Sequence, residues 1–334
     1  MERSIEPKIF DEKAAEPALY WGPEGIRAAL QENRDAMQSR AALEHAMRMH
    51  LVLEGTAMLC DSSYTLWVDL GCMRGRMARE EVQLCGDGEE VRDIAVITRV
   101  GKSVCFVVLG FDFTEDGEEI AVLSRREAQR QCRRAYLDRL QPGDIIPAKV
   151  THLEHFGAFV DVGCGIVSLL SIDCISVSRI SHPSDRFTLG MPIRVIIRSM
   201  EPGGRICVSH KELLGTWEEN AAAFSPGQTV TGIVRSIEDY GVFVELTPNL
   251  AGLAEYRESL TVGQRAAVYI KSMIPARMKV KLVLIDTYRG EGTPGSTRLQ
   301  YFLPEAEGPG GIPHMDVWRY SPEGAGKCVE TVFR

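Results

Sequence analysis

The sequence predicts a mainly β protein, with three tandem five-stranded barrels joined by short helices, an N-terminal helical segment and an extended C-terminal tail. Two observations support this prediction. One aromatic motif recurs three times, each time within a run of short β-rich segments separated by Gly, Asp and Asn turns. Each of the two later runs holds about five strands in about 65–75 residues, which is the size of a five-stranded Greek-key barrel, the OB-fold.

The recurring motif is a pair of aromatic residues three positions apart, followed two positions later by an acid. It reads HFGAFVDVG at 155–163, EDYGVFVEL at 238–246 and, more loosely, SSYTLWVDLG at 62–71. In the two later copies a Pro-Gly turn and a strand precede the motif, and a second Gly-led strand follows it. The repeat therefore extends over whole units and not only over the motif.

Strand alternation makes a specific prediction about the motif. Phe159 and Asp161 should lie on the solvent face of their strand, and Phe156 on the opposite face. A bulge would bring both rings onto one face, and a glycine accommodates a bulge readily. We therefore expect bulges at Gly157 and Gly241.

Helical and strand-like patterns alternate along the chain and define its units. Apolar residues at three-to-four spacing before residue 50 predict helices, and SRREAQRQCRRAYLDRL and KELLGTWEENAAAF predict two helical linkers. The tail is Gly/Pro-rich, and we expect it to dock through Met315, Val317, Trp318 and Tyr320. The predicted units are an N-terminal helical segment at 1–51, a diverged barrel at 52–124, a basic linker helix at 125–140, a barrel at 141–213, a helical linker at 214–224, a barrel at 225–286 and the tail at 287–334.

The net charge of −8 is unevenly distributed along the chain. Residues 1–124 hold 13 basic and 23 acidic residues, whereas residues 125–140 hold 6 and 2. Basic faces therefore remain available for nucleic acid in a chain that is acidic as a whole. No apolar run approaches the ~18 residues of a membrane span, and the N-terminus lacks an apolar signal core, so we expect neither membrane insertion nor export.

Nine cysteines are scattered along the chain, an odd number without the two-residue spacing of metal-binding pairs. We interpret them as free thiols of a reducing cytoplasm. A zinc site that combines His152 and His155 with Cys164 and Cys174 is the alternative, although the spacing matches no common zinc site. The acidic stretch DFTEDGEE is more typical of a hairpin turn than of a metal site. We predict no metal and no cofactor.

Three sets of motifs point to a known family. FGAFVDVG is followed by EPGGRICVSHKE in the middle unit, YGVFVEL by NLAGLAE in the third, and WVDLGCMRGRMAREE by VLSRREA in the first. In these motifs the units resemble the S1 RNA-binding domain. The tandem arrangement with charged helical linkers is similar to the ribosomal protein S1 family of bacteria and its shorter members. The resemblance implies OB-fold barrels and RNA binding.

The resemblance also implies RNA-binding positions. In the family, single-stranded RNA crosses the aromatic pair, a His that follows a third-strand Gly, and an Asp/Arg pair in the last hairpin. Carried over to this sequence, the positions are Phe156, Phe159, Ser168 (in place of His), Glu201 (in place of Asp) and Arg205 in the middle unit, and Tyr240, Phe243, Glu255 (in place of His) and Lys279 (in place of Arg) in the third. In the first unit Tyr64 and Trp67 remain, and Thr65 replaces the glycine.

Stacking explains why exposed aromatics suit this function. Each base that stacks on a ring contributes ~1–3 kcal/mol with little sequence preference. Arg205 and Lys279 would supply charge for phosphates. For each aromatic pair the alternative is that a neighbouring loop or domain covers the rings, and for Tyr64 and Trp67 packing between domains is the stronger interpretation.

Charged residues around the motif leave two further questions open. Arg130, Arg133 and Arg134 of the basic helix are weaker candidates, which belong either to a solvated helix face or to a ridge that follows phosphates. Asp161 and Glu245 either orient a neighbouring Arg or accept hydrogen bonds from bases.

We interpret the chain as a non-enzymatic protein that binds single-stranded RNA in translation and presents mRNA to the small ribosomal subunit. The alternative is an adaptor that docks on the ribosome, RNA polymerase or a ribonuclease with weak or lost RNA binding. The sequence contains no Walker loop, His-Glu zinc helix or Gly-x-Ser-x-Gly elbow, so a hidden nuclease is a third and weaker hypothesis. We expect single-stranded RNA as partner, a cytoplasmic location, and no membrane or small-molecule substrate.

Overall fold

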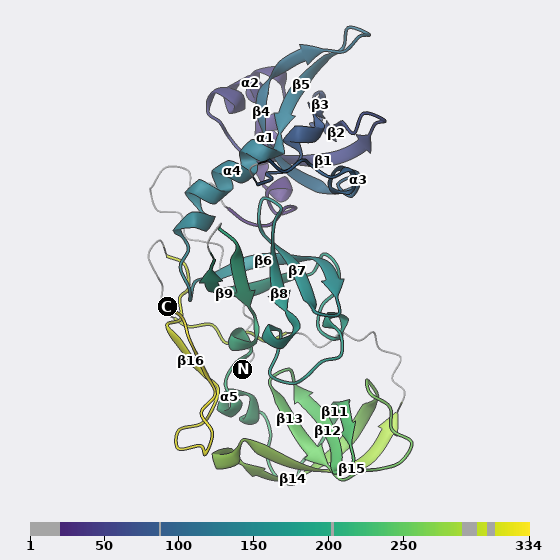
Figure 1. Cartoon of the computed structure of the whole chain (residues 1–334), viewed down its shortest axis with the longest axis vertical. Helices are drawn as coiled ribbons and strands as arrows, with labels where there is room; N and C mark the ends of the chain where they lie inside the picture. Colours follow the sequence, from purple (N-terminus) through teal and green to yellow (C-terminus); the bar gives the residue numbers. More distant parts are fainter. Residues whose placement is uncertain (1–20, 87, 202–203, 289–298, 306–310) are drawn as a thin grey trace.

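The computed structural model describes residues 21–86, 88–201, 204–288, 299–305 and 311–334. Three closed five-stranded barrels follow one another along the chain (Figure 1). In each barrel the strand order is 1-2-3-5-4, and the fourth strand pairs back with the first. Neighbouring strands are antiparallel except for the third and fifth, which are parallel. This is the OB-fold arrangement, so the predicted fold class is confirmed.

The strands lie as follows. The first barrel holds β1 (Leu53–Cys60), β2 (Leu66–Asp69), β3 (Arg74–Met77), β4 (Ser103–Phe113) and β5 (Glu119–Ser124). The middle barrel holds β6 (Ile145–Glu154), β7 (Gly157–Gly163), β8 (Ile166–Ser171), β9 (Pro192–Met200) and β10 (Ile206–Ser209). The third barrel holds β11 (Thr229–Glu238), β12 (Gly241–Thr247), β13 (Leu250–Ala254), β14 (Arg265–Ile274) and β15 (Lys279–Tyr288). The tail holds β16 (Val317–Arg319) and β17 (Glu330–Val332).

Short helices precede and connect the barrels. They are α1 (Gln31–Met37), α2 (Arg40–Arg48), α3 (Asp93–Ile97), α4 (Arg125–Ala135) and α5 (Trp217–Ala221), with 3₁₀ turns that include η1 (Arg27–Ala29), η3 (Leu137–Arg139), η5 (Pro183–Asp185) and η6 (Lys211–Leu214). The basic stretch is helical because Ser124 caps its first turn by accepting a hydrogen bond from the Glu127 amide. Among the helices of the described ranges, none is both long and apolar enough to cross a membrane.

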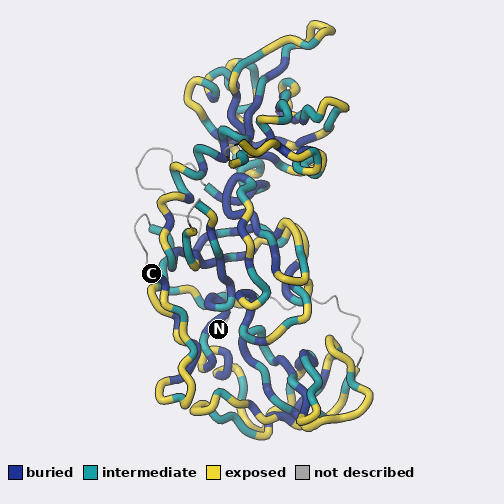
Figure 2. Tube along the Cα trace, in the orientation of Figure 1, coloured by how far each residue is buried: buried dark blue, intermediate teal, exposed yellow. Residues whose placement is uncertain are grey.

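Each barrel is filled by the alternate residues of its strands. In β7 Ala158, Val160 and Val162 are fully buried, as the alternation predicts. Figure 2 shows the same distribution along the whole chain, with buried segments inside the barrels and exposed segments at the loop tips. The core of the middle barrel continues into α4, where Ala128 and Cys132 are fully buried between the first two barrels.

The C-terminal tail returns from the third barrel to the middle one. His314 Nδ1 lies 2.7 Å from Asp144 Oδ1 of the middle barrel, and the Tyr320 hydroxyl donates to the Asn249 carbonyl of the third barrel. Trp318 and Tyr320 are buried against the core of the third barrel, whereas Val317 is exposed. The tail therefore docks at the predicted apolar cluster. Parts of the predicted N-terminal segment and tail (1–20, 289–298 and 306–310) lie outside the described residues.

Candidate nucleic-acid interface

The rings of Phe156 and Phe159 form an exposed pair on the middle barrel, which we call the middle platform. Their centroids lie 6.0 Å apart and their planes are at 90°. Phe156 is 54% exposed, and Phe159 is half-buried. Both rings therefore lie on one outer face of the barrel, where a flat ligand can contact them.

A tight turn, and not a bulge, places the two rings together. His155 and Phe156 form the two-residue turn between β6 and β7, so Phe156 lies outside the strand and its alternation. The register is regular at Gly157, and the bulge lies across the hairpin between Val150 and His152. The expected bulges at Gly157 and Gly241 are wrong. Gly157 is needed for another reason, since a Cβ there would lie 2.4 Å from the Leu170 carbonyl oxygen.

The third barrel has the same arrangement at Tyr240 and Phe243, the third platform. The ring centroids lie 6.2 Å apart at 87°, and Tyr240 is 69% exposed. Asp239 and Tyr240 form the two-residue turn before β12. Gly241 has a φ of 149° and its Cβ would lie 2.5 Å from the Ala254 carbonyl oxygen, so this turn requires glycine.

Strand register identifies further residues beside the platforms that the motif comparison missed. His152 pairs with Phe159, and their rings lie 6.2 Å apart. In the third barrel Phe243 pairs with Leu253, and Leu253 pairs with Lys281, so the exposed Lys281 lies two strands from the platform. The sequence of β15 could have identified Lys281, because Lys279 and Lys281 are two residues apart and strand alternation places both on the same face.

The register also corrects the predicted histidine position. Gly157 pairs with Ser171, and the corresponding glycine Gly241 lies opposite the end of β13, next to Glu255. Ser171 is thus the position equivalent to Glu255. Ser168 is 4% exposed, and its hydroxyl donates to the Ile206 carbonyl inside the barrel wall. Ser168 therefore does not reach the outer face, and the prediction that it contacts RNA is wrong.

Arg205 and Lys279 hold equivalent positions in the last hairpins. The Glu201 amide donates to the Arg205 carbonyl, as Ile274 pairs with Lys279 in the third barrel. Glu201 and Arg205 form an exposed ion pair at 3.8 Å, and the Arg205 side chain is 80% exposed. Screening by water makes such a pair weak, so Arg205 is available to a phosphate.

The first barrel holds its aromatic residues differently. Its β1–β2 loop has five residues, and the Asp61 carboxylate accepts hydrogen bonds from the Ser63 and Thr65 amides and from Trp67 Nε1. These bonds lower the pKa of Asp61 although its partial burial opposes the shift. The Trp67 indole is therefore held by a hydrogen bond to the β1–β2 loop of its own barrel.

Two arginines cover the rings of the first barrel. The Arg74 guanidinium lies 5.1 Å from the Trp67 ring centroid, and that of Arg79 lies 5.3 Å from the Tyr64 ring. Arg79 also pairs with Asp93 at 2.6 Å, and a hydrogen bond to Asp93 raises the pKa of the Tyr64 phenol. Tyr64 and Trp67 are thus occupied by side chains of their own barrel.

The arginines of α4 have unequal surroundings. Arg130 pairs with Glu127 of the same helix, and Arg133 donates to the Gly204 carbonyl in the hairpin that presents Arg205. Arg134 is exposed and forms no ion pair with any described residue. Arg133 therefore positions the hairpin, and Arg134 is the one of the three that is open to a phosphate.

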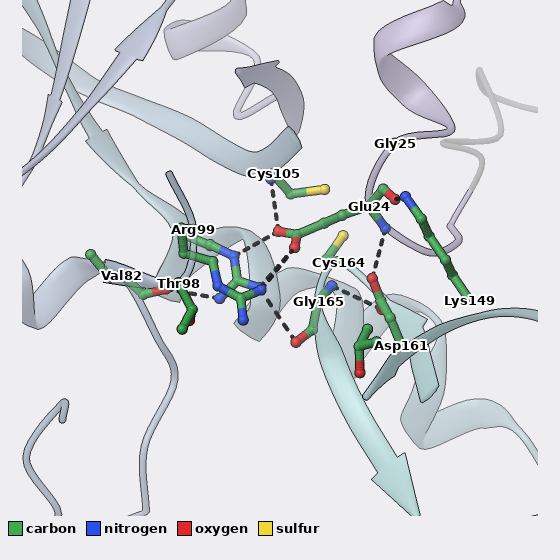
Figure 3. A network of polar contacts seen from close by, with 12 residues as sticks. Glu24, Gly25, Val82, Thr98, Arg99, Cys105, Lys149, Asp161, Cys164 and Gly165 are labelled. Carbon is green, nitrogen blue, oxygen red and sulfur yellow. Dashed lines mark hydrogen bonds and ion pairs between the residues drawn. The ribbon is translucent and has the colours of Figure 1, made fainter. Parts of the chain in front are cut away.

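The acid of the motif has a structural task in both later barrels. Asp161 is 2% exposed and lies at the junction of the first two barrels, so its predicted place on the solvent face is wrong. One carboxylate oxygen accepts from the Glu24 amide at 2.7 Å, and the other from the Gly163 and Gly165 amides (Figure 3).

Glu24 connects this junction to the first barrel. Arg125 Nε lies 2.6 Å from one of its oxygens, and the Cys105 amide of β4 donates to the same oxygen at 3.0 Å (Figure 3). Burial and the nearby Glu24 carboxylate raise the pKa of Asp161 to about 7, against the lowering effect of its hydrogen bonds and of Arg125. Burial also opposes ionisation of Glu24, but Arg125 outweighs it and lowers the pKa of Glu24.

Glu245 holds the equivalent position between the middle and third barrels. Arg235 Nε donates to Glu245 at 2.7 Å, and Arg186 of the middle barrel binds the same oxygen. All three side chains are nearly fully buried. The sequence left two roles open for this acid, and Glu245 has the first of them, because it orients two neighbouring arginines.

The cysteines are all free, and Cys105, Cys132, Cys164 and Cys174 are buried. DFTEDGEE forms the connection between the antiparallel strands β4 and β5, as expected. Within the described ranges, no three or more His, Cys, Asp or Glu side chains are grouped so that they could hold a metal ion.

Comparison with known proteins finds a family model, relatives and solved structures that match this chain. Residues 139–211 match the model of the S1 RNA binding domain. A small ribosomal subunit protein bS1 of Rhodopseudomonas palustris is 32% identical over 240 residues, which cover 66% of this chain and 41% of that protein. A bS1 homolog of Bacillus subtilis is 33% identical over 159 residues, 46% of this chain and 41% of that protein.

The chain thus spans about two fifths of the length of these two relatives. Among solved structures, a multidomain protein with nucleic acid binding domains from Streptococcus pneumoniae matches 70% of this chain and 73% of its own length. It is 15% identical with a TM-score of 0.24, a likeness too low to support any argument.

Proposed function

This chain is an S1-family protein, and on that premise we propose that it binds single-stranded RNA by stacking bases on the middle and third platforms. One observation supports this most strongly: in two barrels the same two-residue turn places an exposed ring nearly perpendicular to a half-buried ring of the following strand. An exposed ring pair on a strand face is costly to leave in water and is suited to sequence-tolerant stacking. Arg205, Lys279 and Lys281 supply charge for the phosphates beside the bases.

The relatives suggest where this binding is used. Both are named as proteins of the small ribosomal subunit. We propose that this chain acts in translation in the cytoplasm, contacts the small subunit and delivers mRNA to it. The buried Arg186–Glu245–Arg235 contacts hold the middle and third barrels together, so RNA bound at one platform raises the effective concentration at the other. Neither role requires catalytic chemistry.

RNA titration tests this function directly. The full chain is titrated with a labelled oligouridine of about 12 nucleotides at about 50 mM salt. Phe156→Ala combined with Phe159→Ala should weaken binding at least ~10-fold, because two stacking contacts are lost. Phe113→Ala is the control, since Phe113 is 66% exposed on the first barrel away from both platforms. Unchanged affinity in the double variant would show that the middle platform does not bind RNA.

A second candidate function applies to the first barrel. Its motif aromatics, Tyr64 and Trp67, are covered by arginines, while Met58, Leu59, Ile94 and Ile97 are all about half exposed or more. These residues favour a protein-docking role, as in the adaptor hypothesis. Ile94→Asp should then abolish cosedimentation of the chain with small ribosomal subunits and leave oligouridine affinity unchanged. Equal cosedimentation of wild type and variant would contradict this role.

A further inference from the structure

The outer face of β14 and β15 differs from its counterparts in the other barrels. In the first barrel Val107 pairs with Ser124, in the middle barrel Ile196 pairs with Ser209, and each pair lies just before the bulge of the ladder between the fourth and fifth strands. The equivalent pair of the third barrel is Tyr269 with Val283. The three barrels can therefore be compared position by position.

In the first two barrels a helix covers this position. Ser124 ends β5 and caps α4, beneath which Val107 is 2% exposed. Ser209 ends β10, the chain turns into η6, and Ile196 is fully buried with Leu213 and Trp217. In both barrels a helical turn thus begins directly after or close to the serine that ends the fifth strand, and Ser124 also caps its helix.

The third barrel leaves the same position open. Val283 has no hydroxyl group with which to cap a helix, and β15 continues as a strand to Tyr288. Tyr269 is 38% exposed and Val283 is 39% exposed. Tyr269 pairs with the exposed Thr229, where the middle barrel has the buried Ile145. In place of the aliphatic pair that packs under the helix in the middle barrel, the third barrel thus has Tyr269 and Thr229. Their polar groups suit a solvent-exposed face.

Unpaired cations connect this face with the third platform. Lys281 lies between Leu253 of the platform side and Ser272 of β14, and Lys271 is in the bulge between Ile270 and Ser272. Lys271, Lys279 and Lys281 are exposed and form no ion pair with any residue in the described ranges. In the first barrel, by contrast, Arg74, Arg76 and Arg79 are all paired with carboxylates.

Resting on the proposed RNA binding, we propose that the RNA strand held at Tyr240 and Phe243 continues across β15 and β14, with its phosphates at Lys281 and Lys271 and a further base stacked on Tyr269. Strands are ~4.8 Å apart, so Lys281 lies ~10 Å and Tyr269 ~15 Å around the barrel from Phe243. This path fits within the site size of ~4–16 nucleotides known for OB-folds. Figure 1 shows β14 at the lower edge of the molecule, away from the middle barrel, so the path leaves the end of the chain of barrels.

Two lengths of RNA test this extension. Labelled oligouridines of about 4 and about 12 nucleotides are titrated against the full chain in a Phe156→Ala background, so that the middle platform does not mask the third barrel. Tyr269→Thr, which keeps a strand-forming residue, should leave the short RNA within ~2-fold and weaken the long RNA ~5- to 150-fold. Phe113→Thr is the matched control. Lys281→Gln should reduce the salt slope for the long RNA by ~0.7, and Lys327→Gln should not.

Each outcome has one meaning. If Tyr269→Thr affects neither RNA, or weakens both equally, the strand does not continue over this face. If the wild-type chain binds no RNA of either length, the proposed function itself fails and the extension fails with it; if only the Phe156→Ala chain binds none, the third barrel holds no RNA and the extension alone fails. If Tyr269→Thr leaves RNA binding unchanged but abolishes a concentration-dependent self-association in sedimentation, the face binds a second copy of the chain and the RNA path is wrong.

Discussion

The first and middle barrels have an aromatic pair at the same place in the same fold, yet only the middle barrel leaves the pair open. In the middle barrel a two-residue turn presents Phe156 beside Phe159, and no cation lies over either ring among the described contacts. In the first barrel a five-residue loop replaces the turn, and Arg74 and Arg79 lie over Trp67 and Tyr64.

Loop length and neighbouring charge account for the difference. The longer loop allows Asp61 to bind both the backbone of the loop and Trp67 Nε1. Tyr64 adopts a φ of 59° in this loop, in the left-handed region that residues other than glycine seldom occupy, whereas neither Phe156 nor Tyr240 has a positive φ. The aromatic motif thus leaves its rings open to a ligand only where the turn is short and the barrel's own cations lie elsewhere.

Single substitutions at the second aromatic of each pair should show the largest contrast. Phe159→Ala should weaken oligouridine binding ~5- to 150-fold, because one stacking contact is lost. Trp67→Ala should change the affinity less than ~2-fold but lower the thermal midpoint, because the Asp61 carboxylate loses its indole partner. Both variants are measured by fluorescence anisotropy and by calorimetry. If Trp67→Ala weakens RNA binding as much as Phe159→Ala, the covered rings of the first barrel open on binding and the contrast is wrong.

The turn glycine gives the next largest effect. Gly241→Ala should destabilise the third barrel by ~1 kcal/mol or more, because φ is positive and the new Cβ would meet the Ala254 carbonyl oxygen. RNA affinity should fall with it, since the same turn presents Tyr240. Gly263→Ala is the control, for it also has a positive φ but open space around the Cβ, so it reports conformational strain alone. Equal losses of stability in the two variants would show that the contact with Ala254 does not matter.

The local parts of this structure could be predicted and the distant ones could not. Period-two alternation and the repeated turn residues predict the barrels and the exposure of Phe159, because both depend on neighbours in sequence. The burial of Asp161 depends on a contact with Glu24, which is 137 residues away in the sequence. The local alternation around Asp161 therefore could not predict that this side chain is buried. Which residue of β8 faces outward depends on the pairing of β7 with β8, and the sequence alone does not specify this register. The prediction for Ser168 fails for this reason, because the outward position is Ser171 and Ser168 lies in the barrel wall.

A smaller effect is expected from the exposed cation of the middle barrel. Arg205→Gln should reduce the slope of log affinity against log salt by ~0.7, which corresponds to the loss of one phosphate contact with a single strand. Affinity at about 50 mM salt should fall only a few-fold, since Arg205 already shares its charge weakly with Glu201. Lys327→Gln in the tail serves as the charge-matched control. An unchanged slope would remove Arg205 from the interface while leaving the aromatic contacts in place.

The smallest effect on RNA affinity should come from the acid that links the two compared barrels, because its side chain is buried in the junction. The pKa of Asp161 is about 7 in the folded chain against an ordinary 3.8, so folding favours the protonated carboxyl. Between these values the folded state binds more protons than the unfolded state, and the contribution of Asp161 to stability must fall as pH rises from about 4 to above 7. Asp161→Asn removes the titration while keeping an oxygen that accepts from the Gly163 and Gly165 amides.

The thermal midpoint of wild type minus that of Asp161→Asn should therefore decrease between pH 5 and about pH 7 and level off above it. A difference for Asp161 that grows with pH would mean that the carboxylate is ionised in the folded chain. The junction would then be stabilised by attraction between the Asp161 carboxylate and the Arg125 guanidinium.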